Sequence, residues 1–225
     1  MYNPADLPNT RSMRADMKSA GMLTLVLLLL AGCSPVREGS RGSQRVGPTS
    51  LAFSNPRQNE LLPVPVVVSF IRDRATLRAH FEIKATTVNA RPQLSRNEYP
   101  YDYDVVEVFV SNARSGSSTY YEFEVSPYNQ ALQVNGISPR LEYYFGVRDG
   151  FAHTATLTAG GWAVDMFIPL TSIGWHDGQP LELIGNAYAA LGAGDARAYW
   201  SLFELPPGQP DFHIPGAFRP LLGAN

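Results

Sequence analysis

Short apolar runs begin at residue 64, and none of them has the spacing of an amphipathic helix. Turn residues separate these runs, so each is expected to form a β-strand of ordinary length. About ten such strands without a long helix predict an all-β fold, an antiparallel β-sandwich of jelly-roll type. One helical turn is expected at residues 171–173. The predicted strands cover residues 64–70, 76–83, 105–110, 119–126, 132–134, 141–147, 152–158, 162–168, 183–189 and 198–203.

Residues 105–110 (VVEVFV) stand at the centre of this pattern. The run has the composition of a strand covered on both faces, except for Glu107 in its middle. Successive side chains of a strand point to opposite faces, so Glu107 and Phe109 share one face and Val108 lies on the other. A buried, unpaired carboxylate is costly, so Glu107 is expected to contact either a ligand or an internal hydrogen-bond network.

The next strand, residues 119–126, follows a short polar turn and alternates cleanly. Tyr121 and Phe123 face one side, and Glu122 and Glu124 face the other. Such alternation is typical of an antiparallel strand with one face in the core and one in solvent, so this strand is interpreted as half-buried.

The N-terminus carries a targeting signal rather than part of the fold. Residues 22–31 (MLTLVLLLLA) have the length of a signal-peptide apolar region, and Arg14 and Lys18 precede them. The sequence Leu-Ala-Gly-Cys at residues 30–33 matches a bacterial lipoprotein cleavage signal. We therefore expect residues 1–32 to be removed and Cys33 to be acylated, for instance with palmitate. A general secretory signal with a cysteine placed by chance is the alternative.

The residues after Cys33 predict an anchored domain on a tether. Residues 33–59 are rich in Ser, Gly, Pro and Arg and show no periodicity, which predicts a disordered tether before a domain at residues 60–225. Ser34, and not an aspartate, follows the cysteine, which is the pattern of lipoproteins sorted to the outer membrane of the bacterial envelope. Cys33 is the only cysteine, so no disulfide stabilises the domain.

Composition and motifs narrow the class of function. The chain has 225 residues, of which 44% are hydrophobic, and a formal charge of −2. This allows one domain with a proper core and gives no basic excess that would indicate nucleic-acid binding. The sequence has no G-x-S-x-G, H-E-x-x-H or P-loop motif, and its four histidines lack metal-ligand spacing. A monomeric protein that is not an enzyme and needs no cofactor is therefore expected.

Five blocks of the chain, in order, resemble carbohydrate-binding module family 9-like domains, which belong to the DOMON-like β-sandwich superfamily. The resemblance runs from residue 65 to the C-terminus and implies a β-sandwich that binds sugar. The blocks are the hairpin at residues 99–129, Gly161-Trp162 leading to FIPL at residues 167–170, GNAY at 185–188, YWS at 199–201 and FHIP at 212–215.

The resemblance also implies a binding site. In sugar-binding members, two aromatic rings sandwich a terminal sugar and a glutamate meets its hydroxyls; by motif position these are Tyr101, Trp200 and Glu107. Stacking suits the apolar C–H face of a sugar ring, and carboxylates suit its hydroxyl rim. Tyr101 stands where the family usually has tryptophan, and Trp200 could instead fill the core. Further candidates are Asn186, Arg197, which stands where an amide would be expected, and Tyr121.

Two other readings remain open. Related sandwiches hold a b-type haem between a methionine and a histidine or lysine, and Met166 with His213 or His153 would be the residues here. Alternatively, the protein is an envelope scaffold that has kept the fold and lost the sugar site, which the Tyr101 and Arg197 departures favour.

Overall fold

The computed structural model describes residues 44–53, 65–116, 118–137, 142–145, 150–207 and 211–222. The predicted signal peptide, Cys33 and the first part of the predicted tether lie outside the described residues. Within the described ranges, no helix combines the length and the apolar character that a membrane span needs.

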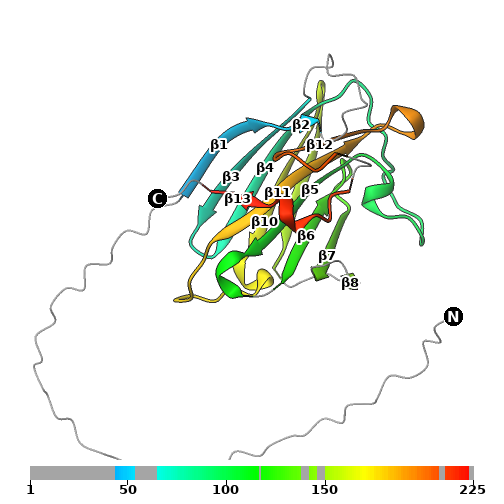
Figure 1. Ribbon diagram of the computed structural model, residues 1–225. Helices are drawn as coiled ribbons and strands as arrows, with labels where there is room; N and C mark the ends of the chain where they lie inside the picture. Colours follow the sequence, from blue (N-terminus) through cyan, green and yellow to red (C-terminus); the bar gives the residue numbers. More distant parts are fainter. Residues whose placement is uncertain are drawn as a thin grey trace, which may run out of the picture. The chain divides into compact units, whose positions relative to one another are not determined.

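Two antiparallel sheets form the described fold, which confirms the predicted all-β sandwich (Figure 1). The five-stranded sheet has the order β1 (Gln44–Ser50), β3 (Val66–Asp73), β4 (Thr76–Lys84), β10 (Gly161–Pro169) and β9 (Ala152–Thr158). The eight-stranded sheet has the order β2 (Ala52–Phe53), β12 (Ala198–Ser201), β11 (Leu183–Leu191), β5 (Val105–Asn112), β6 (Thr119–Val125), β7 (Ala131–Ile137) and β8 (Glu142–Phe145), and β13 (Arg219–Pro220) also pairs with β11. Pro169 leads into the predicted helical turn, the 3-10 helix η3 (Leu170–Ile173).

The fold begins earlier than the sequence predicts. Strands β1 and β2 lie within residues 33–59, the predicted tether, and pair with β3 and β12. Leu51, between them, is fully buried, and its backbone N–H donates to the carbonyl of Val66 at 3.0 Å. Residues 44–53 contain few large apolar side chains, so the sequence pattern does not identify them as strands. Their pairing with β3 and β12 compensates for this low apolar content.

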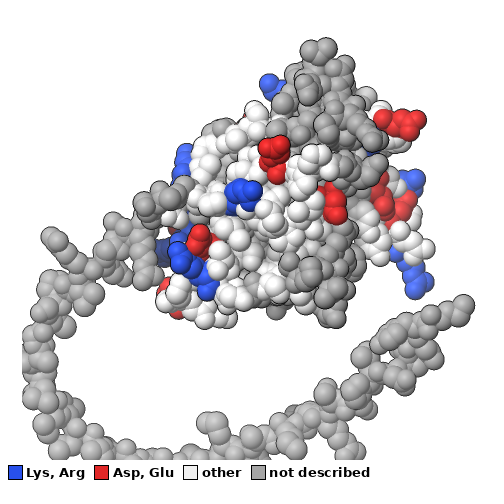
Figure 2. All heavy atoms as spheres, in the orientation of Figure 1, with Lys and Arg blue, Asp and Glu red and all other residues white. Residues whose placement is uncertain are grey.

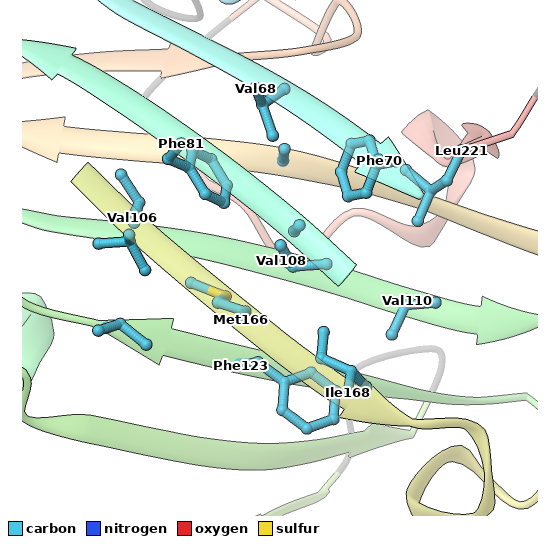
Figure 3. Close-up of a cluster of buried hydrophobic side chains, with 14 of the residues drawn as sticks. Val68, Phe70, Phe81, Val106, Val108, Val110, Phe123, Met166, Ile168 and Leu221 are labelled. Atoms are coloured by element: carbon cyan, nitrogen blue, oxygen red, sulfur yellow. The ribbon is translucent and has the colours of Figure 1, made fainter. Parts of the chain in front are cut away.

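The core lies between the two sheets and consists of closely packed apolar side chains (Figure 3). Every second residue of β5, from Val106 to Val110, points into it. Each large apolar side chain contributes about 1.5–3 kcal/mol on burial, and with a single cysteine in the chain this burial must hold the sheets together. The core residues labelled in Figure 3 are Val68, Phe70, Phe81, Val106, Val108, Val110, Phe123, Met166, Ile168 and Leu221.

The other side of the eight-stranded sheet, called here the outer face, is also covered. All eight residues of β5 are buried. The C-terminal segment (residues 202–207 and 211–222) lies over β11 and β5, and it includes the red strand β13 of Figure 1. Its Leu205 and Phe218 belong to a second apolar cluster with Phe109, Tyr120 and Tyr188.

This cover corrects the interpretation of β6 as a half-buried strand. Glu122 and Glu124 point away from the core as predicted, but only 3% and 1% of their surfaces are exposed. The alternation therefore reports two different buried environments, one apolar and one polar, and not a core face and a solvent face. The sequence pattern cannot separate these cases, because the covering segment lies about eighty residues away along the chain.

Candidate functional site

Three buried glutamates meet at the centre of the outer face. Glu107 of β5 lies opposite Glu124 of β6, and Glu122 lies opposite the next outer-face residue of β5, Phe109. Carboxylate oxygens of the three side chains all lie within 4.8 Å of one another. We call Glu107, Glu122 and Glu124 the carboxylate cluster. Their separation is small enough for shared protons, for hydrogen bonds to a polyhydroxy ligand, or for a hard cation such as Ca²⁺, which prefers carboxylate oxygens.

Burial governs the protonation of this cluster. It raises the pKa of Glu107 well above its ordinary value; the charge of Glu122 raises it further, and that of Arg197 opposes the rise. Burial also raises the pKa of Glu124, and its hydrogen bond with Glu122 and the charge of Glu107 act in the same direction. Like charges in one buried site resist joint ionisation, so the cluster retains protons at pH values where isolated glutamates are charged.

One residue of the C-terminal segment reaches the cluster. The His213 Nε2 atom lies 3.7 Å from a Glu122 carboxylate oxygen, and its Nδ1 atom lies 3.0 Å from the Tyr120 hydroxyl. The ring also packs edge-on against Phe109, with centroids 5.1 Å apart. His213 therefore joins the covering segment to the polar part of the sheet.

Tyr101 supplies an exposed aromatic ring beside the cluster. It lies in the 3-10 helix η1 (Pro100–Asp102), and 39% of its surface is exposed. Its ring stacks on that of Tyr99, with centroids 5.1 Å apart and planes 10° from parallel. Partial burial raises the pKa of the Tyr101 hydroxyl, and the charges of Asp102, Glu124 and Glu122 add to the shift. The helix η1 contacts β6, the strand that carries Glu122 and Glu124, so the ring stands beside the cluster. On the face shown in Figure 2, charged side chains are few, and basic and acidic groups are interspersed.

Arg197 fixes the loop that carries Tyr101. Its Nη2 atom donates to the carbonyls of Tyr101 at 2.7 Å and Tyr103 at 3.0 Å, and its Nη1 atom donates to the carbonyl of Gly192 at 3.3 Å. Asp104 holds the end of the same loop by accepting the Gly192 N–H at 2.6 Å. The planar fork of a guanidinium suits such multiple carbonyl contacts. Arg197 therefore positions the Tyr101 ring relative to β11 and β12.

Trp200 lies on the opposite side of the sheet. It pairs with Ala189, is 4% exposed and belongs to the core between the sheets, whereas Glu107 points to the outer face. Its neighbour Tyr199 points to the outer face, and the centroid of its ring lies 6.0 Å from that of Phe212 in the C-terminal segment. The structure does not bring Trp200 and Tyr101 together as the two walls of a sugar clamp.

The remaining two candidates also serve the fold. Asn186 is fully buried; its side-chain oxygen accepts the Phe203 N–H at 2.9 Å and its amide nitrogen donates to the Phe203 carbonyl at 3.2 Å. Tyr121 pairs with Val110 and packs against the core from its core-facing side. Of the six predicted binding residues, the structure groups Tyr101, Glu107 and Arg197. Asn186 lies on the same outer face but bonds the C-terminal segment, and Trp200 and Tyr121 lie on the core side.

Glu122 and Glu124 are the site residues that sequence reasoning missed. The sequence places both on one face of their strand, and Glu107 on one face of the neighbouring strand. Counting the hairpin register would pair Glu107 with Glu124 and thus gather three acids on one side. The C-terminal segment that covers this side of the sheet has no sequence pattern that predicts its position there.

Of the two histidines considered for haem ligation, His153 lies opposite Met166 and His213 lies on the other sheet. Met166 is fully buried among the apolar side chains of the core, whereas His213 lies on the outer face of the other sheet. His153 pairs with Met166 across β9 and β10, but its Nδ1 atom lies 2.9 Å from the side-chain oxygen of Asn129.

Comparison with known sequences gives one distant relative. No protein-family model matches the chain. A protein of Arthroderma benhamiae described as an extracellular protein is 26% identical over 145 residues. The matched region is 58% of this chain and 65% of that protein, so it spans less than two thirds of the relative.

Comparison with solved structures shows the fold. A crystal structure of a protein from Bacteroides uniformis, proposed to bind carbohydrate, superposes with a TM-score of 0.61 at 19% identity, covering 79% of this chain and 84% of that one. A carbohydrate-binding module of family 9 from Caldicellulosiruptor kristjanssonii, in complex with glucose, gives a TM-score of 0.41 at 16% identity, covering 77% and 81%. The first of these two structures shares the β-sandwich fold described here.

Proposed function

We propose that this protein binds carbohydrate at the outer face of the eight-stranded sheet. The observation that carries the proposal is the exposed Tyr101 ring, held by Arg197 beside the carboxylate cluster. A sugar presents an apolar C–H face and a rim of hydroxyls, and this site offers an aromatic ring next to carboxyl oxygens. The structural similarity to a protein that is itself proposed to bind carbohydrate supports the same function.

The residues take different roles in this proposal. Tyr101, backed by Tyr99, stacks on the face of a glycan end or a short oligosaccharide. Glu107, the more exposed of the opposed pair at 4%, hydrogen-bonds a sugar hydroxyl, accepting when ionised and donating when protonated, and the buried Glu124 supports it from the neighbouring strand. Arg197 is a positioning residue, because its guanidinium is already bonded to loop carbonyls.

The geometry of the acids favours binding without cleavage. Glycosidases place two carboxyl groups about 5–5.5 Å or about 6.5–9.5 Å apart across the scissile bond. Here three carboxyl groups crowd within 4.8 Å of one another, on one side of a sheet and nearly out of solvent. They cannot flank a substrate from two sides as such a mechanism needs.

The same proposal includes display from a membrane. The signal-like residues 1–32 and Cys33 support lipid attachment at the bacterial cell envelope, and outer-membrane sorting follows from Ser34. The domain then binds glycans of the envelope or from outside the cell.

One observation favours a second candidate, the envelope scaffold. Trp200 and Asn186, two of the predicted ligand residues, are used by the fold. A scaffold would keep both for stability and would need no free aromatic ring.

A glycan array followed by calorimetric titration tests the proposal. The protein would be a soluble fragment from Ser34, and the ligand for titration the strongest array hit. Tyr101→Ala should weaken binding by about 1–3 kcal/mol, the scale of a stacked aromatic contact. Tyr128→Ala is the matched control, because Tyr128 is similarly exposed, at 37%, but lies in another turn. If no glycan binds, or if both variants bind like the wild type, the scaffold candidate replaces the proposal.

A further inference from the structure

A shallow groove lies on the five-stranded sheet, away from the core. It has a volume of about 250 Å³. Strands β1, β3 and β4 form it, and the carboxylate cluster lies on the other sheet. The lining residues are Arg45, Val46 and Gly47 of β1, Ser69 and Ile71 of β3, and Arg78 and His80 of β4.

An irregularity in β1 accounts for the hollow. The pairing of β1 with β3 shifts between Val46 and Thr49, which is the signature of a β-bulge. A bulge bends its strand and re-aims side chains, and bulges are enriched next to functional sites. A side chain built on Gly47 would meet nothing within 4 Å, so this edge of the groove is open.

The groove presents hydrogen-bond donors and positive charge. None of its seven lining residues is acidic. Arg45 is exposed and makes no ion pair or hydrogen bond with any residue that the structure describes. It pairs with Ile71, which in turn pairs with Arg78, so the two arginines flank an apolar side chain on the same face of the sheet.

Asp165 orients the far wall of the groove without lining it. One of its oxygens accepts from Arg78 Nε at 3.0 Å and Nη2 at 2.6 Å, and lies 3.0 Å from His80 Nδ1. Burial would raise the pKa of Asp165, but the bonds from Arg78 and His80 outweigh it and hold that pKa below its ordinary value. The other acid nearby, Glu82, lies 3.5 Å from His80 Nε2 and is largely exposed. Asp165 thus offsets one arginine, whereas Arg45 has no ion-pair partner among the described residues.

We propose that this groove is a second binding site, which takes the carboxylate or sulfate group of an acidic saccharide. The guanidinium fork of Arg45 can bind such an oxyanion with paired, charge-assisted hydrogen bonds, because Arg78 is already bonded to Asp165, and Ser69 adds a hydroxyl donor. The volume is below the roughly 300–1,000 Å³ of pockets that enclose a whole ligand, so the groove holds one charged residue of a longer chain. This site does not depend on the proposed sugar site of the other sheet.

Nuclear magnetic resonance titration tests the groove directly. The full chain, ¹⁵N-labelled in a detergent that carries neither sugar nor net charge, is titrated with D-glucuronate, D-glucose 6-sulfate and D-glucose at constant ionic strength. Saturable shifts of the Ser69 and Ile71 amides are expected with the two anions and not with glucose. Arg45→Gln should raise the dissociation constants about tenfold, equivalent to the loss of one charge-assisted hydrogen bond.

Two controls separate this site from general charge effects and from the sugar site. Arg96→Gln makes the same charge change at an exposed loop position outside the groove and should bind like the wild type. Tyr101→Ala should also bind the two anions like the wild type, because Tyr101 lies over the eight-stranded sheet and not over the groove. The proposal is overturned if the groove amides do not saturate, if glucose shifts them equally, or if Arg45→Gln and Arg96→Gln weaken the anions alike.

Discussion

Glu107 and Glu124 lie directly opposite each other on neighbouring strands, with both side chains buried. Like charges in such a cross-strand position destabilise a sheet, and burial adds a desolvation cost. The sheet therefore tolerates the pair only while protons or bound groups neutralise it.

We expect the stability of the protein to fall as the pH rises because of this pair. The folded-state pKa values of Glu107 and Glu124 lie above the unfolded value of about 4.3, so the folded state keeps protons that the unfolded state releases. Their contribution is complete below about pH 4.3 and is lost as the pH rises through the raised pKa values, at up to about 1.4 kcal/mol per pH unit for each proton. Urea unfolding of the wild type and of Glu124→Gln at pH values from about 5 to about 8, all above the unfolded pKa, measures this loss of stability.

The glutamine variant should be progressively more stable than the wild type toward pH 8. Glu204→Gln, at an exposed position, is the control and should follow the wild type throughout. Parallel stability curves for the wild type and Glu124→Gln would show that the pair does not hold protons.

Trp200→Ala should mainly reduce stability. The indole fills the core between the sheets, and its loss should cost about 3–5 kcal/mol through the cavity that remains. Tyr101→Ala, at a partly exposed ring, should change the free energy of unfolding by only about 0.5 kcal/mol. Chemical unfolding of both variants measures the difference. A Trp200→Ala variant with wild-type stability that no longer binds sugar would restore Trp200 as a ligand residue.

Arg197→Lys should loosen the Tyr101 loop even though it keeps the charge. A lysine cannot reproduce the fork that bonds the carbonyls of Tyr101 and Tyr103. Hydrogen exchange of the Asp102 and Tyr103 amides, which close the turn of η1, should accelerate at least about tenfold, as expected for one lost charge-assisted hydrogen bond. Arg96→Gln, in the same loop, should leave these rates unchanged. Unchanged exchange in Arg197→Lys would mean that packing alone holds the loop.

Removal of residues 34–54 should destabilise the domain, although the sequence predicts a tether there. The deletion removes β1, β2 and the buried side chain of Leu51. Loss of that one buried side chain costs about 1.5–3 kcal/mol, before the lost strand pairing is counted. Thermal unfolding of fragments that begin at Ser34 and at Asn55 compares the two. Equal melting temperatures would mean that residues 44–53 do not stabilise the domain and belong to the tether, as the sequence predicts.

Lipid attachment is tested at Cys33. Labelled palmitate should be incorporated into the wild type and not into Cys33→Ser, which should accumulate unprocessed or be released from the membrane fraction. A wild type that takes up no label would contradict the proposed anchor.

The strand pattern of the domain was predictable because alternation and turn residues act locally. The faces of Glu107 and Val108 followed from strand geometry alone, and the structure confirms them. The early strands β1 and β2 escaped prediction because pairing, rather than their own apolar content, stabilises them.

The site was less predictable because it depends on contacts between distant parts of the chain. Motif position selected Trp200, but strand parity turns that ring into the core and turns Tyr199 outward. Glu122 and Glu124 resembled solvent-facing residues, but His213 of the C-terminal segment reaches Glu122 and the helix η1 contacts their strand, so both are buried. A resemblance predicts which residue type occupies a position. The strand register and the segments that cover the sheet determine what that residue contacts.

The position of the C-terminal segment means that the fold can be completed only after the last residues of the chain are available. A chain synthesised from its N-terminus emerges with all the longer strands of both sheets before residues 202–222 follow. Until they arrive, Phe109, Tyr120 and Tyr188 have no cover, which leaves an apolar surface of the kind that promotes aggregation. Chaperones that bind exposed apolar surface would meet the protein at that stage, and any fusion partner that delays docking of the last residues would prolong it.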